Sequence, residues 1–234
     1  MARVALDAGS RSGVTNLGMW PCAFLSISDG ALLESTPALH SLELASAVAM
    51  APLRRAEFAQ GRWHARAALA RWGLGDAELP VASDRAPLWP VGFVGSISHV
   101  PPDAETGQPG HVIAVAARQS DCAGLGVDIE RSARLLPEHW PNFLSERELA
   151  WLLGRPVAQR SMLAHSIWSA KEAAMKAVRQ ALDPQDVEIE VDADAQTFMA
   201  SCRSTDGARG LLDIRLTGWL TSAPGWVAAL AILN

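Results

Sequence analysis

The chain has 234 residues, of which 49% are hydrophobic and 19% are charged, and its formal net charge is −5. This length suits one large domain or two small ones, and the composition is that of a globular protein rather than a disordered one. The mild negative charge argues against non-specific nucleic-acid binding as the main activity.

The cysteines and the apolar segments indicate a cytoplasmic protein. The cysteines form no CxxC or Cys/His pattern, which argues against a structural zinc site, and we expect buried free thiols of the reducing cytosol at Cys22, Cys122 and Cys202. The amino terminus has no apolar stretch typical of a signal peptide. The most apolar segment, "WVAALAIL", is far shorter than the ~20 residues that span a bilayer.

One strand and two helices are predicted in the first third of the chain. Residues 1–18 are small and polar and are expected to be irregular. A strand is predicted at 22–28, "CAFLSIS", and a helix at 37–50. A stronger helix is predicted at 52–72, where good helix formers are preceded by a proline and followed by a glycine. Residues 74–95 show no helical period and are expected to form a loop.

Three strands and two helices are predicted in the middle of the chain. The strands are "GSISHV", "HVIAVAAR" and "AGLGVDIE", and the first two are joined by the turn-rich segment "PPDAETGQPG". The helices are predicted at about 137–153 and 156–181, because a glycine and a proline separate two helical patterns.

The last quarter of the chain is rich in predicted strands, namely "DVEIEV", "TFMASC", "LLDIRLTGWL" and "WVAALAIL". Helices followed by strands therefore occur twice along the chain. We predict an α+β fold with an N-terminal half at 1–118 and a C-terminal half at 119–234.

Two carboxylates stand on one face of the strand that contains "GVDIE". Side chains alternate along a strand, so Asp128 and Glu130 point the same way, whereas Val127 and Ile129 point into the core. Two such charges repel unless a cation lies between them, and Mg²⁺ prefers hard oxygen ligands. The alternative is a strand end with both acids solvated, and "GVDIE" taken alone favours that alternative.

A third acid stands in the helical segment "WSAKEAAMKA". Glu172 and Lys176 are four residues apart and share a face, with Trp168 one turn earlier on it, while Lys171 lies on a neighbouring flank. Taken alone, this helix is better explained by a surface Glu–Lys pair, worth about 0.3–0.5 kcal/mol, and by Trp168 in ordinary core contact.

The two stretches together resemble the bipartite signature of the 4′-phosphopantetheinyl transferases, (V/I)-G-(V/I)-D-x-E … (F/W)-(S/C/T)-x-K-E-x-x-x-K. Leu125 stands at the first position as a mild substitution. The segment "GSISHV" resembles the Ser-His stretch of the larger, surfactin-type branch. Two longer segments, "RRAEFAQGRWHARAAL" and "DRAPLWPVGFVGSISH", are similar to the enterobactin synthase component D group.

The resemblance implies a Mg²⁺-dependent transferase, a holo-[acyl-carrier-protein] synthase. It would move the 4′-phosphopantetheine arm of coenzyme A onto a serine of an acyl- or peptidyl-carrier protein and release adenosine 3′,5′-bisphosphate. The implied fold has two similar α+β halves related by a pseudo-twofold axis, with coenzyme A between them, in a monomer. The component D likeness points to a siderophore or other secondary-metabolite pathway.

The resemblance also implies roles for single residues of the C-terminal half. Asp128, Glu130 and Glu172 would hold the metal, and Glu172 would accept the serine proton. Lys176 would contact the coenzyme's phosphates as a mobile point charge. Asp128 and Lys171 would also line the coenzyme site.

The phosphate end of the coenzyme is expected on the N-terminal half. Arg55, Arg62 and Arg66 share one stripe of the 52–72 helix, which is unfavourable unless an anion is near. A solvated face with local counter-charges explains the same stripe equally well. The resemblance assigns coenzyme-binding roles to Arg55, Arg62, Arg85, Pro87, Ser98 and His99.

Docking of an acidic carrier protein would need a basic or apolar patch, because this chain is acidic too. We expect that patch on arginines between the two motifs, namely Arg131, Arg134, Arg147, Arg155 and Arg160.

Two other functions stay open. A Mg²⁺-dependent phosphohydrolase acting on a coenzyme A-like pyrophosphate would use water as nucleophile, and a non-catalytic module would bind coenzyme A without modifying any carrier.

Overall fold

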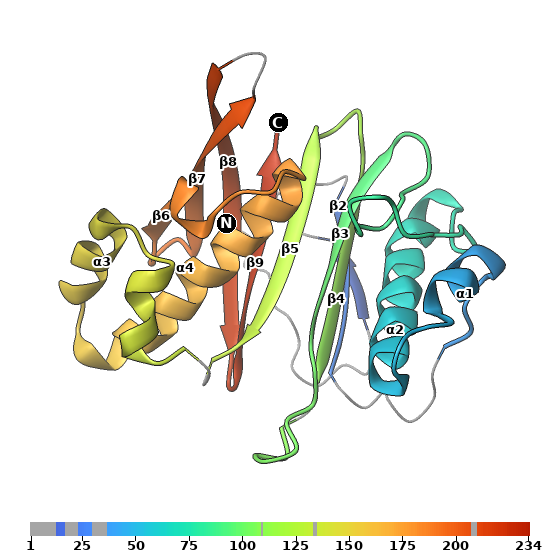
Figure 1. Ribbon diagram of the computed structural model, residues 1–234, viewed down its shortest axis with the longest axis horizontal. Coiled ribbons are helices and arrows are strands. Elements are labelled where there is room, and N and C mark those ends of the chain that lie inside the picture. Colours follow the sequence, from blue (N-terminus) through green and yellow to red (C-terminus); the bar gives the residue numbers. More distant parts are fainter. Residues whose placement is uncertain (1–12, 17–22, 30–36, 109, 133–134, 207–209) are drawn as a thin grey trace. The chain divides into compact units, whose positions relative to one another are not determined.

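The computed structural model describes residues 13–16, 23–29, 37–108, 110–132, 135–206 and 210–234. The chain divides into two compact units, residues 1–123 and 124–234 (Figure 1). Each unit has one antiparallel sheet and one long helix, which confirms the predicted α+β class. The domain boundary after residue 118 and the pseudo-twofold axis stay predictions.

The first unit is built on a four-stranded sheet with the strand order β1-β2-β4-β3. Its strands are β1 (Gly13–Asn16), β2 (Ala23–Asp29), β3 (Phe93–Val100) and β4 (His111–Arg118). Its helices are α1 (Ser41–Ala47), α2 (Pro52–Leu69) and the short 3₁₀ helix η2 (Ala70–Trp72). Helix α2 lies on the sheet, and Ala65 and Leu69 meet Ala114 and Ala116 of β4 in the core.

The second unit is built on a five-stranded sheet with the strand order β5-β9-β8-β7-β6. Its strands are β5 (Gly124–Arg131), β6 (Val187–Asp192), β7 (Thr197–Asp206), β8 (Gly210–Ala223) and β9 (Trp226–Leu233). Its helices are α3 (Glu146–Leu153), α4 (Val157–Val178) and the 3₁₀ helices η3 (Pro137–Asn142) and η4 (Pro184–Asp186). Helix α4 crosses β5 and β9 (Figure 1).

The two units repeat one order of elements. In each, a strand is followed by a short helix, a long helix and an antiparallel hairpin, giving β2-α1-α2-β3-β4 and β5-α3-α4-β8-β9. The last strand, β4 or β9, pairs with both the first strand and its hairpin partner. The hairpin β6–β7 is an addition in the second unit. This repeat agrees with the prediction of two similar halves.

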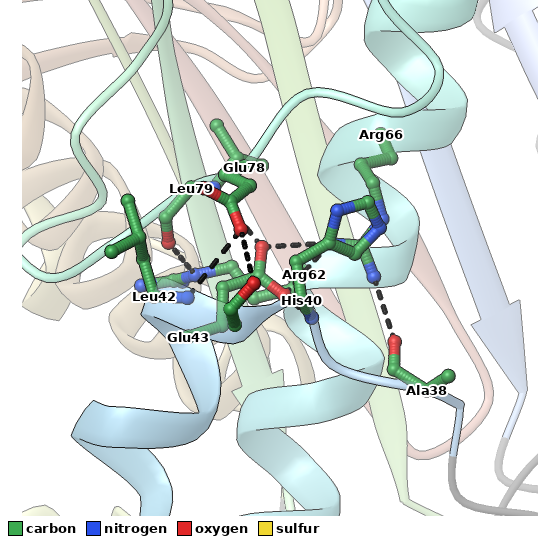
Figure 2. A network of polar contacts seen from close by, with 9 residues as sticks. Ala38, His40, Leu42, Glu43, Arg62, Arg66, Glu78 and Leu79 are labelled. Atoms are coloured by element: carbon green, nitrogen blue, oxygen red, sulfur yellow. Dashed lines mark hydrogen bonds and ion pairs between the residues drawn. The ribbon is translucent and has the colours of Figure 1, made fainter.

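A buried glutamate ties α1 to the rest of the first unit (Figure 2). Glu43 accepts hydrogen bonds from the backbone N–H groups of His40 and Leu79, both at 3.0 Å. Arg66 of α2 donates to both oxygens of this carboxylate, at 2.7 and 2.9 Å, and to the carbonyl of Ala38 at 3.1 Å. One carboxylate thus joins a helix start, a second helix and the loop that follows it.

The second unit holds α3 in the same way. Glu148 accepts hydrogen bonds from the backbone N–H groups of Ser145 and Ile189, both at 2.7 Å. Lys171 of α4 lies 2.8 Å from the Glu148 carboxylate. Arg66 and Lys171 each follow their glutamate by 23 residues, so the repeat extends to single ion pairs.

Element boundaries differ from the sequence-based predictions where local chemistry interrupts a pattern. The predicted helix at 137–153 is a 3₁₀ helix and an α-helix, because Ser145 caps a new start by accepting from the Glu148 N–H at 3.2 Å. The predicted helix at 37–50 shortens to α1. Strand β1 lies in a stretch that was expected to be irregular.

Two cysteines of the described residues are buried. Cys122 and Cys202 are buried free thiols, as predicted, whereas Cys22 lies outside the described residues. Burial raises the pKa of Cys202 to about 11, so that thiol is unreactive. None of the helices in the described ranges has the length and apolar character to cross a bilayer.

Candidate active site

A glycine allows α4 and β5 to approach closely. A Cβ atom at Gly126 would overlap the backbone carbonyl oxygen of Ala173, so no larger residue fits there. Because side chains alternate along β5, the residues two and four positions further on, Asp128 and Glu130, lie on the same face as Gly126. The close approach therefore brings two carboxylates against α4.

Five side chains from β5 and α4 meet at this contact. The Lys176 Nζ atom lies 2.6 Å from Asp128 Oδ1 and 3.9 Å from Glu172 Oε2. The Trp168 indole N–H donates to Glu130 Oε1 at 2.9 Å. Asp128 is buried, whereas the side chains of Glu172 and Lys176 are 29% and 31% exposed. The structure thus brings Asp128, Glu130, Glu172 and Lys176 together as one acidic cluster.

The surroundings of the acidic cluster disfavour the ionised forms of Glu130 and Glu172. Burial raises the pKa of Glu130, and the charge of Asp128 raises it further, against the opposing effects of Trp168 and Lys176. Burial also raises the pKa of Glu172, and there Lys176 opposes while Asp128 adds. An additional positive charge beside these carboxyl groups would therefore stabilise their ionised forms.

The donor chemistry of this cluster fits a divalent cation. Three carboxylates offer the hard oxygen ligands that Mg²⁺ takes, usually one or two of them together with phosphate oxygens. In the part of the chain that the structure describes, no three His, Cys, Asp or Glu side chains already stand in the geometry of a metal site. The acids are neighbours that share Lys176 rather than a closed cage, and metal binding by them stays a prediction.

Lys171, the other predicted lysine, lies apart from the acidic cluster. Its side chain is fully buried and contacts Glu148 and the carbonyl oxygens of Pro184 and Val187. Burial lowers the pKa of Lys171, and Glu148 opposes that effect. The sequence placed Lys171 on a neighbouring flank of α4, and the structure shows that this flank points into the core of its own unit.

In the first unit, His99 of β3 contacts the start of α2. Its Nε2 atom lies 3.0 Å from Glu57 Oε2 and 2.9 Å from Arg54 Nη1, and Arg54 and Glu57 are 3.2 Å apart. Among the predicted arginines, Arg62 was favoured and Arg55, which is exposed, was a weaker candidate, whereas Arg54 was not predicted and Glu57 was expected only as a local counter-charge. The sequence of this helix does indicate the pair, since Arg54 and Glu57 are one helical turn apart and carry opposite charges.

The other predicted arginines of α2 have partners within the chain. Arg62 is 5% exposed, donates to the Leu79 carbonyl and lies 4.3 Å above the Phe58 ring centroid. Burial lowers the pKa of Arg62 to about 10. Arg66 is paired with Glu43, so the arginine stripe already has a counter-charge, at a residue that the sequence analysis did not consider.

The other residues of the first unit that were predicted to contact coenzyme A are Ser98 on β3 and two residues, Arg85 and Pro87, that precede this strand. Ser98 is buried, and as the neighbour of His99 on β3 it points to the opposite face. Arg85 is exposed with a positive φ of 69°, and Pro87 forms a bridge with Val81. The structure therefore does not bring the side chains of Ser98 and His99 together, and all these coenzyme contacts stay predictions.

Of the arginines expected to form a docking patch, three that the structure describes are buried or have partners within the chain. Arg131 is buried, and Arg134 lies outside the described residues. Arg147 is exposed and pairs with Glu188 and Glu190 of β6. The hydrogen bond with Glu190 and the charge of that residue raise the pKa of Arg147. Arg160 donates to backbone carbonyls at 2.7 and 2.8 Å. Carrier docking on these residues stays a prediction.

Known proteins match both units. Residues 42–101 match the family model described as 4′-phosphopantetheinyl transferase N-terminal domain, and residues 124–224 match the 4′-phosphopantetheinyl transferase superfamily. The chain is 38% identical over 169 residues to 4′-phosphopantetheinyl transferase Svp of Streptomyces mobaraensis, covering 68% of this chain and 63% of that protein. It therefore spans less than two thirds of that relative's length.

A solved structure matches in part. The crystal structure of Thermotoga maritima holo-[acyl-carrier-protein] synthase is 18% identical, with a TM-score of 0.36, over 48% of this chain and 64% of that one. The two family models match one after the other along the chain, and the second covers the acidic cluster. The chain belongs to the 4′-phosphopantetheinyl transferase superfamily.

Proposed function

We propose that this protein transfers the 4′-phosphopantetheine arm of coenzyme A to a serine of an apo-carrier protein, with Mg²⁺, and releases adenosine 3′,5′-bisphosphate. Family membership supports the reaction class. One structural observation carries the proposal, namely that β5 and α4 bring three carboxylates and Lys176 into one partly exposed cluster. Pyrophosphate chemistry needs such a set of charges.

The residues of the acidic cluster have separate tasks in this proposal. Asp128 and Glu130 hold the divalent cation together with Glu172, and that cation, when bound, neutralises the phosphate oxygens of the coenzyme. Lys176 is partly exposed, so its flexible side chain can turn its ammonium group toward a phosphate oxygen. Positioning and charge neutralisation supply most of the rate in phosphoryl transfer.

Glu172 is the proposed general base for the acceptor serine. Its pKa is raised by burial, which makes its carboxylate a stronger base than that of a free glutamate. Its side chain remains 29% exposed, so a serine carried by another protein can reach it. A serine hydroxyl is a poor nucleophile unless such a base accepts its proton.

The finer assignments belong to the same proposal. They include the surfactin-type branch with its likeness to component D, a monomer in the cytoplasm, and a siderophore or other secondary-metabolite pathway. For the 3′-phosphate of the coenzyme, we propose His99 together with Arg54, because these two side chains are in contact.

Intact-mass spectrometry of apo-carrier proteins tests the proposal. The wild-type protein, coenzyme A and Mg²⁺ should add one phosphopantetheine mass to at least one acyl- or peptidyl-carrier protein. The matched variant Glu172→Gln keeps the shape of the side chain and removes the base, so it should leave the carrier in its apo form over the same time. Carriers from several pathways are compared in parallel to identify the partner.

The same reactions separate the two rival functions. Release of adenosine 3′,5′-bisphosphate from coenzyme A without any carrier would support the phosphohydrolase and contradict the transferase. Binding of coenzyme A, with every carrier unmodified and no bisphosphate released, would support the non-catalytic module.

A further inference from the structure

The indole of Trp168 makes a directed contact with the acidic cluster. Its N–H group donates to Glu130 Oε1 at 2.9 Å, across from α4 to β5. From the sequence, Trp168 was expected to act only through apolar packing, either in the core or in fixing the helix against the site. A phenyl ring would fill most of the same space but could not donate this hydrogen bond. The contact thus gives the tryptophan a task beyond filling the core.

The ring of Trp168 is held in a fixed direction. It meets the buried Phe143 ring edge-on, with centroids 5.1 Å apart and an interplanar angle of 70°. The indole also lies against the apolar core of the second unit. A donor on an immobilised ring can fix the rotamer of the carboxylate that it binds, whereas a donor on a flexible side chain cannot.

The neutral character of the indole also matters. Lys176 contacts Asp128 with a full positive charge, which competes with any cation that the acids would bind. Trp168 contacts Glu130 without adding a charge, so this contact does not compete with a cation for the carboxylate. Its hydrogen bond occupies Oε1 and leaves Oε2 to another partner. Hydrogen bonds of this kind orient the ligands of metal sites.

We propose that Trp168 is a positioning residue, which holds the Glu130 carboxylate in the orientation that binds the divalent cation. This inference rests on the proposed function, because that function places a cation at Glu130. It goes further by assigning the orientation of one ligand to the indole N–H rather than to the ring.

Mn²⁺ binding to the protein alone, followed by electron paramagnetic resonance of the free ion, tests this role without an activity assay. Trp168→Phe keeps an aromatic ring and should weaken Mn²⁺ binding roughly tenfold or more, the usual effect of losing a partner that orients a ligand. Glu130→Gln should also weaken it, and adding Trp168→Phe to Glu130→Gln should cause little further loss. Trp151→Phe, on α3 and stacked on Arg155, is the matched control and should bind as the wild type does.

The outcomes separate this inference from the proposed function. Tight wild-type binding that is weakened by Glu130→Gln but unchanged by Trp168→Phe would overturn the role of Trp168 and leave the transferase intact. A wild-type protein that binds no Mn²⁺ would overturn both this inference and the proposed metal site.

A second measurement covers the case in which Trp168→Phe does not fold. The indole N–H resonance of Trp168, identified through its contact with Phe143, should shift during a Mg²⁺ titration of the wild type. The shift should disappear in Glu130→Gln. A resonance that stays constant in the wild type while Mg²⁺ binds would contradict the proposal.

Discussion

At the scale of single residues, Glu172 combines a contact with Lys176 and a raised pKa. Burial raises the pKa of this carboxyl, so its ionised form is held in the folded protein at some cost in stability. Such a cost is expected where a carboxylate is kept for chemistry rather than for folding. The same residue is therefore expected to matter strongly for catalysis and little for stability.

Replacement Glu172→Gln should lower kcat by roughly 10²–10⁴-fold, the usual contribution of a general base. The variant should unfold at the same temperature as the wild type at pH 7, or at a higher one. A raised pKa stabilises the fold below the unfolded-state pKa of about 4.3, and this stabilisation is lost as the pH rises through the folded-state value. Near-normal kcat would contradict the proposed role.

A second residue, His64, makes the first unit sensitive to acid. It is fully buried, and burial lowers its pKa to about 4. The folded state therefore excludes a proton that the unfolded chain takes up near pH 6.5, so stability is present above that pH and is lost as the pH falls toward 4. Between pH 7 and pH 5 this histidine should cost about 2 kcal/mol of unfolding free energy.

Urea unfolding at several pH values checks the histidine prediction. His64→Gln should lower stability at pH 7, yet lose about 2 kcal/mol less than the wild type between pH 7 and pH 5. Parallel stability curves for the two proteins would show that His64 does not titrate in this range.

At the scale of elements, the contact between α4 and β5 determines whether the acidic cluster forms. Replacement Gly126→Ala would place a methyl group on the Ala173 carbonyl and push the helix away from the strand. We expect a loss of about 1–3 kcal/mol in unfolding free energy from overpacking. We also expect a drop in kcat, because Lys176 and Glu172 move with α4.

Gly154→Ala is the control for this substitution. Gly154 ends α3 with an ordinary helical φ of −73°, and an added Cβ would lie 3.4 Å from its nearest neighbour, the Trp151 carbonyl. This variant should keep the wild-type kcat and unfold within about 0.5 kcal/mol of the wild type. If both alanine variants behaved alike, the close approach of α4 to β5 would not matter for the site.

The sequence was informative where a pattern depends on local geometry. Strand alternation predicted that Asp128 and Glu130 share a face, and both contact α4 in the structure. Helical spacing likewise predicted the pairing of Glu172 with Lys176. It could not show that Lys171 points into the core, because that depends on where β6 and α3 pack.

The sequence also could not predict which of two adjacent residues contacts another element. Arg54 rather than Arg55 meets His99, since the rotation of α2 against β3 is set by core contacts far along the chain. The same reason explains why Glu43 was overlooked as the partner of Arg66, 23 residues away. A sequence pattern gives the spacing within one element, not the neighbour across two.

At the scale of the whole molecule, each unit has a buried ion pair between its short and its long helix, at the same place in its chain order. The pair of Glu148 and Lys171 implies that Lys171 serves the fold of its unit. Lys171→Met should lower the unfolding free energy by about 3–5 kcal/mol, because it leaves Glu148 with an uncompensated buried charge. The double variant with Glu148→Gln should lose less than the two single losses combined.

Steady-state kinetics under conditions where Lys171→Met is folded complete that test. The KM for coenzyme A should remain within about twofold of the wild type, since Lys171 is fully buried against Glu148 and the carbonyl oxygens of Pro184 and Val187. If the KM for coenzyme A rose more than tenfold in a Lys171→Met variant of normal stability, Lys171 would contribute to coenzyme binding and this prediction would be wrong.

The account depends above all on three acids sharing one divalent cation, and anomalous diffraction from crystals grown with Mn²⁺ and coenzyme A tests this most directly. We expect a single manganese peak in contact with oxygens of Asp128, Glu130 and Glu172, with the coenzyme's phosphates completing its coordination. A manganese peak on the coenzyme that touches none of these carboxylates, or a coenzyme bound away from Lys176, would contradict the proposed site.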